Sequence, residues 1–331
     1  MTPPTMAGAV AGQPPGQARP ATTRDACRRA LLELARVDQR VICVDADMGG
    51  LDDVFAERPG QYVNVGIAEA NLMSLSAGLA TTGFRPFAHT ICSFAVARAC
   101  EQIKIDIASA GLPVCVVVTH SGLSAGHYGP THHSVNDLAI IRTMPNMTVL
   151  VPADVAEAEW AVRAAHQLPG PAFIRLGRDA TPAVHDGPCA PQVGQALTLR
   201  EGDDVAIVAT GPHPVLMALA AATSLGVLGV GARVLGMHTV KPIDEAALVQ
   251  AAEQTRGIVT VEDHLVVGGL GGAVAEVVAQ HRPCRVHRIG VPDEFIDRVG
   301  DERYLLAEAG VGADQIVAAA LSLVRATAAA R

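Results

Sequence analysis

The sequence predicts an α/β protein made of two doubly wound domains with mainly parallel sheets. Helical and strand patterns alternate along most of the chain, as in parallel sheets joined by right-handed crossovers. The predicted strands are rich in Val, Ile and Leu, which is typical of parallel strands buried on both faces. The length of 331 residues exceeds one ordinary domain and favours two.

Helices and strands are expected in turn over residues 22–180, the first predicted domain. The Val/Ile-rich runs predict strands, and apolar residues at helical spacing predict helices. Gly83 and Gly111 are expected to end two of these helices. The strands are expected at 40–50, 62–67, 112–120, 146–154 and 171–178, the helices at 24–37, 68–83, 95–111 and 153–168, and residues 85–94 are mixed.

A segment with Pro and Gly at 181–193 is expected to be the linker to a second domain at 194–331. The alternation of strands and helices starts again beyond it. Strands are expected at 203–211, 232–240, 257–263 and 284–290, and helices around 214–226, from Asp244 and from Gly268.

Residues 1–21 are rich in Pro, Gly and Ala and are predicted to be a disordered tail. No basic segment followed by a sustained apolar run is present in it, so a signal peptide is not expected. No uninterrupted apolar run is long enough to span a bilayer, so we expect no membrane association.

Charge and cysteine usage narrow the classes of partner. The net charge is −8 and no Lys/Arg-rich block is present, which argues against nucleic acid and anionic membranes. The seven cysteines are scattered, without a CxxC pair or metal-ligand spacing. This usage indicates a reducing, cytoplasmic setting.

One carboxylate stands in the apolar and small-residue run VNVGIAEANLMSLSAGLA. This is Glu69, and burying a charged group in such surroundings is costly unless it has a partner. Two interpretations are open from the residue alone. It is a carboxylate favoured by a helix N-terminus, or a catalytic group whose pKa burial has raised so that it can share a proton.

Polar residues follow several predicted strands. Asp45, Asp47, His120 and Arg178 lie near strand ends, where active sites gather in doubly wound sheets.

Taken together, ten motifs resemble the C-terminal half of a transketolase, and in particular the two-gene transketolases of bacteria and archaea. The resemblance runs from Arg24 to the end of the chain. In order the motifs are the first helix containing Arg24, VDADMGG, VGIAEANL, HTICSFAVARACEQI, VTHSGLSAGHYGPTHH, RTMPNMTVLVPAD, FIRLGR, MHTVKPID, VEDH and GGLGG.

This resemblance implies a thiamine-diphosphate pyrimidine-binding domain followed by a transketolase C-terminal domain. The family's GDG…N signature, which holds Mg²⁺ and the diphosphate, is not found in this sequence. The resemblance therefore implies an N-terminal partner subunit that holds both, an α₂β₂ assembly, and no metal in this chain.

For the cofactor, the resemblance implies roles for three residues. Glu69 would hydrogen-bond the aminopyrimidine and promote proton transfer, Phe94 would stack on its ring, and Ile67 would contact it. A Phe94 that only fills the core is the competing interpretation.

For the substrate, the resemblance implies that His132 faces the reacting sugar as a second catalytic residue. His120 would lie near the acceptor phosphate, and Arg24 and Arg178 would bind phosphate bidentately. Asp47 is expected to face the cleft. The competing interpretations are a metal site for the clustered histidines, surface salt bridges for the arginines, and a turn cap for Asp47.

Two further histidines are expected to have supporting roles. His133 is expected behind the substrate-facing residues, and His264 is expected to be structural.

The chain departs from the family pattern at three places. AEQN reads AEAN, with Ala70 in place of Gln, and STF reads HTI, with His89 on the substrate side. GEDGPTHQ reads GHYGPTHH, so Tyr128 replaces an Asp that would contact a donor sugar hydroxyl, and His127 replaces the Glu before it. Such groups set substrate discrimination.

The function expected from the resemblance is transfer of a two-carbon ketol unit from a ketose, or ketose phosphate, to an aldose acceptor. The departures suggest specialisation for a modified sugar. The alternatives are a 2-oxo acid decarboxylating or 1-deoxyxylulose-phosphate synthase-like enzyme, and a non-catalytic scaffold subunit.

Overall fold

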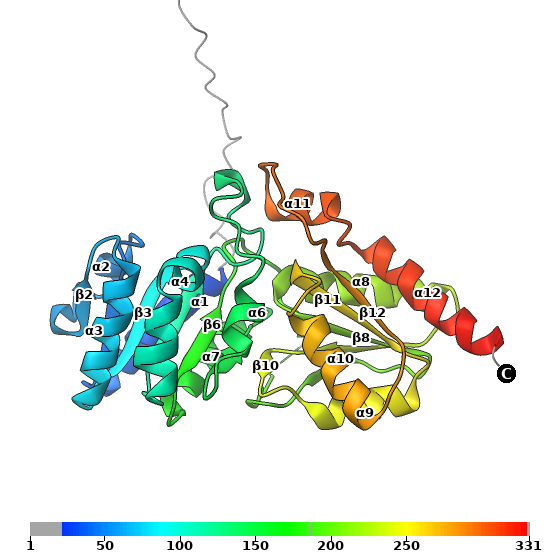
Figure 1. Ribbon diagram of the computed structural model, residues 1–331, viewed down its shortest axis with the longest axis horizontal. Coiled ribbons are helices and arrows are strands. Elements are labelled where there is room, and N and C mark those ends of the chain that lie inside the picture. The colour runs from blue at the N-terminus through cyan, green and yellow to red at the C-terminus, as the bar shows by residue number, and fades with distance from the viewer. Residues whose placement is uncertain (1–21, 186, 188, 330–331) are drawn as a thin grey trace, which may run out of the picture.

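The computed structural model describes residues 22–185, 187 and 189–329, and the predicted tail at 1–21 lies outside the described residues. Two α/β domains lie side by side, one coloured blue to green and the other yellow to red (Figure 1). Each has a mainly parallel sheet covered by helices on both faces, so the predicted fold class is confirmed.

The first sheet has seven strands in the order β10-β5-β6-β4-β3-β1-β2, and all neighbours except β10 and β5 are parallel. Its central strand β4 has the sequence CVVVT and is buried throughout, as the Val-rich run predicts. The strands are β1 (Val41–Asp45), β2 (Tyr62–Asn64), β3 (Arg85–Ile91), β4 (Cys115–Thr119), β5 (Thr148–Leu150), β6 (Ala172–Arg175) and β10 (Thr239–Lys241).

Helices cover both faces of this sheet. One buried core lies under α1 and α7, and the other under α3, α4 and α6. Local capping explains two of the starts, because Thr22 accepts from the Asp25 amide and Asp154 accepts from the Glu157 amide. The helical elements are α1 (Thr23–Val37), α2 (Leu51–Val54), η1 (Pro59–Gln61), α3 (Glu69–Thr81), α4 (Cys92–Arg98), α5 (Cys100–Gln102), η2 (Ile103–Ser109), η3 (Gly126–Tyr128), α6 (Asp137–Arg142) and α7 (Val155–Gln167).

The single helix predicted at 95–111 is wrong in detail. Helix α4 begins earlier, at Cys92, and ends where Ala99 leaves helical geometry with φ −116° and ψ 17°. The chain then resumes in α5 and continues as the π-helical segment η2. Apolar periodicity does not distinguish this interrupted path from one continuous helix.

The second sheet has five strands in the order β12-β11-β8-β9-β7, with only the edge strand β7 antiparallel. The sequence did not predict β7, a short strand in which intermediate and exposed residues alternate. The elements are β7 (Leu197–Arg200), β8 (Val205–Thr210), α8 (Pro212–Val227), β9 (Ala232–Gly236), α9 (Glu245–Gln254), β11 (Ile258–Leu265), α10 (Leu270–His281), β12 (Val286–Val291), α11 (Glu302–Glu308) and α12 (Ala313–Ala329).

The strand predicted at 232–240 is two strands in two different sheets. Strand β9 ends at Gly236, and β10 then pairs antiparallel with β5 of the first sheet. In Figure 1, β10 lies between the two domains. A pattern of apolar residues cannot show that a strand changes sheets, because both segments are buried.

The apolar stretch Glu302–Ala326 has the length and composition of a membrane-crossing helix. In the fold it is two helices, α11 and α12, separated at residues 309–312. Leu305, Ile316 and Ala320 are buried in the core shared with α8. We therefore interpret this stretch as core-packing helices of the second domain.

A buried arginine of the first domain forms an ion pair there and also hydrogen-bonds the second domain. Arg175, the last residue of β6, donates to Asp137 from Nε at 2.6 Å and from Nη2 at 3.2 Å. Its Nη2 also donates to the Asp263 carbonyl oxygen of β11 at 2.8 Å. Burial alone would raise the pKa of Asp137, but Arg175 outweighs it and holds that pKa below its ordinary value.

Arg175→Ala should destabilise the protein by about 3–5 kcal/mol, because it leaves the Asp137 carboxylate buried without its partner. Urea unfolding followed by circular dichroism measures the change. The control Arg163→Ala removes an exposed pair with Glu33 and should cost no more than about 1 kcal/mol. Equal effects of the two variants would contradict the structural role of Arg175.

Candidate active site

The site is built where parallel strands of the first sheet end. Strand β3 leads directly into α4, which bears Phe94, and β4 leads into the loop that begins with His120. Strand β6 ends at Arg175, and Arg178 lies three residues beyond it. These carboxyl ends lie at one edge of the sheet, as predicted for a doubly wound fold.

Glu69 is the first residue of α3 and its side chain is 5% exposed. The carboxylate therefore lies at a helix N-terminus, where the helix dipole favours a negative charge. This position agrees with the helix N-terminus interpretation drawn from the sequence, and the catalytic interpretation stays a prediction. Its described partner is Arg98, whose Nη1 donates to Glu69 Oε1 at 3.1 Å.

Arg98 also covers Phe94. The guanidinium carbon lies 3.8 Å from the centre of the Phe94 ring, a cation–π distance. The two residues are four apart on α4, so their side chains lie on one face of the helix. A flat, nitrogen-bearing group thus stacks on Phe94 while it hydrogen-bonds Glu69. The sequence prediction missed Arg98, although its F-x-x-x-R spacing was a usable signal.

The loop from His120 to His133, called the histidine loop below, adjoins Phe94. The His132 ring meets Phe94 edge-on, with centroids 5.1 Å apart, and Tyr128 lies 4.8 Å from His132. His127 packs on Tyr128 at 3.9 Å, and His120 lies 6.3 Å from it. The structure therefore brings together Phe94 and four predicted loop residues in one chain of ring contacts.

A cavity of about 540 Å³ borders this group. Phe94 and Arg98 line one side, His133 and Thr131 another, and Phe295 of the second domain a third. The side chain of Phe295 is 94% exposed, so it offers an apolar surface to whatever enters or covers the cavity.

A second cavity, of about 550 Å³, contains the two predicted phosphate-binding arginines. Arg24, Arg178 and His127 line it, and so do four acidic residues, Asp25, Asp179, Asp301 and Glu302. Arg178 Nη1 lies 2.8 Å from His127 Nδ1. Arg24 Nε is buried without a hydrogen-bond partner in the described part of the chain, and its nearest carboxylate oxygen, on Asp25, is 3.9 Å away. Two guanidinium groups with a free donor suit an anionic substrate group.

Burial and nearby arginines lower the pKa of two of the histidines. Burial, and then the charges of Arg178 and Arg24, lower the pKa of His120 to about 4. Burial and Arg178 also lower the pKa of His127. A neutral imidazole can accept a proton or donate a hydrogen bond, as handling sugar hydroxyls requires.

Four residues singled out from the sequence lie apart from these contacts. Ile67 is 72% exposed, and Asp47 is exposed, with its carboxylate accepting from Asn64. His89 is buried, its Nε2 has no hydrogen-bond partner among the described residues, and burial lowers its pKa to about 3. His264 accepts from the Ala139 amide at 3.2 Å, which supports a structural role between the domains.

These contacts fit one end of an aminopyrimidine. The planar Arg98 guanidinium already makes the two contacts that such a ring needs, a stack on Phe94 and a hydrogen bond to a buried Glu69. The site therefore has both the apolar wall and the proton acceptor for a flat heterocycle.

Comparison with known protein families shows which family this chain belongs to. Residues 19–183 match the transketolase pyrimidine-binding domain, and residues 194–316 match the transketolase C-terminal domain. The chain belongs to the transketolase family. The resemblance drawn from the motifs is therefore confirmed.

Relatives from several bacteria share this architecture. The chain is 41% identical over 300 residues to a 6-deoxy-6-sulfo-D-fructose transketolase subunit of Clostridium sp. (strain MSTE9), covering 90% of this chain and 92% of the relative. It is 38% identical to one of the subunits of an apulose-4-phosphate transketolase of Phocaeicola vulgatus, covering 91% and 98%. It is 37% identical to 1-deoxy-D-xylulose-5-phosphate synthase 1 of Geobacter sulfurreducens, covering 87% of this chain but 46% of that one.

A solved structure agrees with these relatives. A split-gene transketolase, described as an inactive beta4 tetramer, superposes with a TM-score of 0.84 at 39% identity. The match covers 92% of this chain and 99% of that chain. The match to this member of the transketolase family therefore runs through both of its domains.

The His120 imidazole should titrate near pH 4 in the folded protein, well below the ordinary value of 6.5. As the pH falls, His120 is protonated in the unfolded chain at about pH 6.5, before it is protonated in the folded chain at about pH 4. Proton binding therefore favours unfolding over this range, so the stability that His120 contributes is complete above about pH 6.5 and declines towards pH 4. Titration of the histidine ring protons by NMR measures the midpoint. Arg178→Ala should raise it, and Arg163→Ala should not. A wild-type midpoint near 6.5 would refute the assigned environment.

Proposed function

We propose that this chain is the C-terminal subunit of a thiamine-diphosphate-dependent transketolase. It would transfer a two-carbon ketol unit from a ketose or ketose phosphate to an aldose. The observation that supports this most is the buried Glu69 carboxylate beside the stacking face of Phe94, in a chain of this family.

The proposed role of Glu69 depends on a movement of Arg98. The Arg98 side chain is 51% exposed. Among the described residues it is held by one hydrogen bond, to Glu69, and by one ring contact, with Phe94, so it can swing towards solvent. Phe94 would then stack on the pyrimidine, and Glu69 would hold a proton at a ring nitrogen. Thiamine diphosphate, when bound, supplies the nucleophilic carbon and the electron sink.

Residues of the histidine loop would handle the sugar. His132 lies against Phe94 and is the proposed group for moving a proton at the reacting hydroxyl. His120 would donate a hydrogen bond while neutral, and Arg24 and Arg178 would hold the anionic end of the substrate. Ile67 is also proposed to contact the cofactor, and Asp47 and His89 the substrate, but only in the complex with the partner subunit.

The rest of the cofactor site is proposed to belong to an N-terminal, diphosphate-binding subunit. That chain would hold the diphosphate and Mg²⁺, so their ligands are expected there. The proposed complex is an α₂β₂ heterotetramer with its active sites between subunits. The seven cysteines are all free, which suits the reducing environment of the cytoplasm.

The proposed substrate is a modified sugar. Two relatives are named for 6-deoxy-6-sulfo-D-fructose and apulose 4-phosphate, which are not the ordinary pentose phosphates. In this chain His127 and Tyr128 stand where the family pattern has two carboxylates, and His127 faces the arginine-lined cavity. Exchanging carboxylates for an imidazole and a phenol removes negative charge from the donor side of the pocket.

The second candidate is a 1-deoxyxylulose-phosphate synthase-like or other 2-oxo acid decarboxylating activity. The support is the 37% identity to such a synthase, of which this chain spans only about half. Pyruvate as donor, with release of CO₂ measured, separates it from ketol transfer. A non-catalytic scaffold is the third candidate, and Glu69 distinguishes it.

Glu69→Gln in the complex with its partner should lower kcat by roughly 10²–10⁴-fold, because the amide cannot hold the proton that the carboxylate shares. A coupled assay of ketol transfer measures kcat, and circular dichroism checks that the variant folds. The control Glu101→Gln changes an exposed carboxylate on α5 and should leave kcat unchanged. Full activity of Glu69→Gln would support the scaffold instead.

His127→Glu combined with Tyr128→Asp restores the family's usual residues and should shift donor preference towards ordinary ketose phosphates by at least about 10-fold in kcat/KM. The measurement is kcat/KM over a panel of sulfonated, deoxygenated and unmodified ketoses, with wild type and double variant side by side. A wild-type enzyme that prefers ordinary pentose phosphates, or an unchanged preference, would contradict the proposed specialisation.

A further inference from the structure

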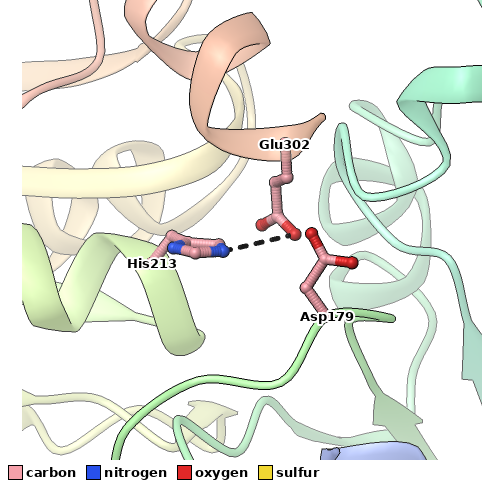
Figure 2. Close-up of side chains that lie close together, drawn as sticks. All are labelled: Asp179, His213 and Glu302. Carbon is pink, nitrogen blue, oxygen red and sulfur yellow. Dashed lines mark ion pairs between the residues drawn. The ribbon is translucent and has the colours of Figure 1, made fainter. Parts of the chain in front are cut away.

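Three metal-ligating side chains from separate segments converge outside the proposed cofactor and sugar contacts. Asp179 follows β6, His213 lies in the first turn of α8, and Glu302 begins α11. Figure 2 shows the imidazole and both carboxylates pointing towards one another. One ligand atom from each lies within 4.8 Å of the others, and His213 Nε2 is 3.7 Å from Glu302 Oε2.

The unexplained group in this cluster is the His213 imidazole. The residue is 4% exposed, and its Nε2 has no hydrogen-bond partner within the described part of the chain. The 3.7 Å separation from Glu302 is too long for a hydrogen bond. A buried polar atom without a partner costs free energy, so a nitrogen aimed at two carboxylates needs something between them.

The surrounding charges favour a cation. Burial, and then the charges of Asp263 and Asp179, raise the pKa of the Glu302 carboxyl well above its ordinary value. Arg175, the buried cation nearby, is already bound to Asp137. Arg303 and Asp301 act on His213 in opposite directions. The site thus holds the carboxyl groups of Asp179, Glu302 and Asp263 close to one imidazole whose Nε2 has no hydrogen-bond partner among the described residues.

We propose that Asp179, His213 and Glu302 bind one divalent transition-metal ion of the Zn²⁺ or Mn²⁺ class. One imidazole nitrogen and two carboxylate oxygens are suitable ligands for Zn²⁺. Two ligands at about 2.1 Å from a tetrahedral ion lie about 3.4 Å apart, so the observed 3.7 Å needs only a small contraction. Asp179, which is exposed, would close the site last.

The ion would act as a cross-link between the domains. It would tie the start of the interdomain segment to two helices of the second domain, at the wall of the cavity that contains Arg178 and Glu302. It is separate from the Mg²⁺ expected on the partner subunit, and the inference does not depend on the proposed function. Metal binding would fix the position of Asp179, and with it the part of the cavity wall next to Arg178.

Calorimetric titration of the EDTA-treated full chain with ZnCl₂ and with MnCl₂ tests the site directly. We expect one ion per chain, at least 10-fold weaker binding for Asp179→Asn, and loss of that equivalent for His213→Gln. Zinc should also raise the melting temperature of the wild type but not of Asp179→Asn, since a ligand stabilises only the state that binds it. Asp179 is exposed, so its variant tests the site even if His213→Gln fails to fold.

Two variants control for zinc bound at other histidines. His281→Ala removes an exposed imidazole on α10, and His132→Ala removes one from the histidine loop; neither should change the stoichiometry or affinity. Absence of a stoichiometric ion would overturn the proposal. So would binding that survives Asp179→Asn and disappears in His132→Ala, because the ion would then lie in the loop.

Discussion

The buried Arg175 guanidinium holds the two domains in the arrangement on which the site depends. It bonds the Asp137 carboxylate at the start of α6 and the main chain of Asp263 in the other sheet. The Asp263 carboxylate in turn accepts from the Leu123 amide at 3.0 Å, within the histidine loop. One cation thereby links the end of β6, the second domain and the loop that presents His120 to His133.

On this scaffold the chain presents the contacts that are proposed for one end of the cofactor. The chain holds a buried carboxylate, an aromatic face and a cluster of histidines, all at one edge of the first sheet. Arg98 occupies the contacts that the pyrimidine would make, with its other face towards a cavity of about 540 Å³. In the proposed complex such a surface would hold the heterocyclic end of the cofactor, and the N-terminal partner subunit would hold the diphosphate. Arg98 would satisfy Glu69 until the cofactor binds.

Much of the fold and part of the site followed from the sequence because they depend on local patterns. The Val-rich strands and the helix starts at Thr22 and Asp154 are set by neighbouring residues. The path of β10 into the other sheet is set by long-range packing, which apolar periodicity does not reveal. Glu69 and Phe94 could be found because the motif is contiguous. Arg98 was missed because its role comes from three-dimensional contact, and the cluster of Asp179, His213 and Glu302 joins segments that lie far apart in the sequence.

The central claim is that this chain supplies the pyrimidine end of a shared cofactor site. Calorimetric titration with thiamine diphosphate and Mg²⁺ tests it most directly, on the isolated chain and on its complex with an N-terminal transketolase subunit from the same genome. We expect weak or undetectable binding to the isolated chain and tight binding to the complex, with Glu69→Gln weakening the latter. Tight cofactor binding by the isolated chain would contradict this claim.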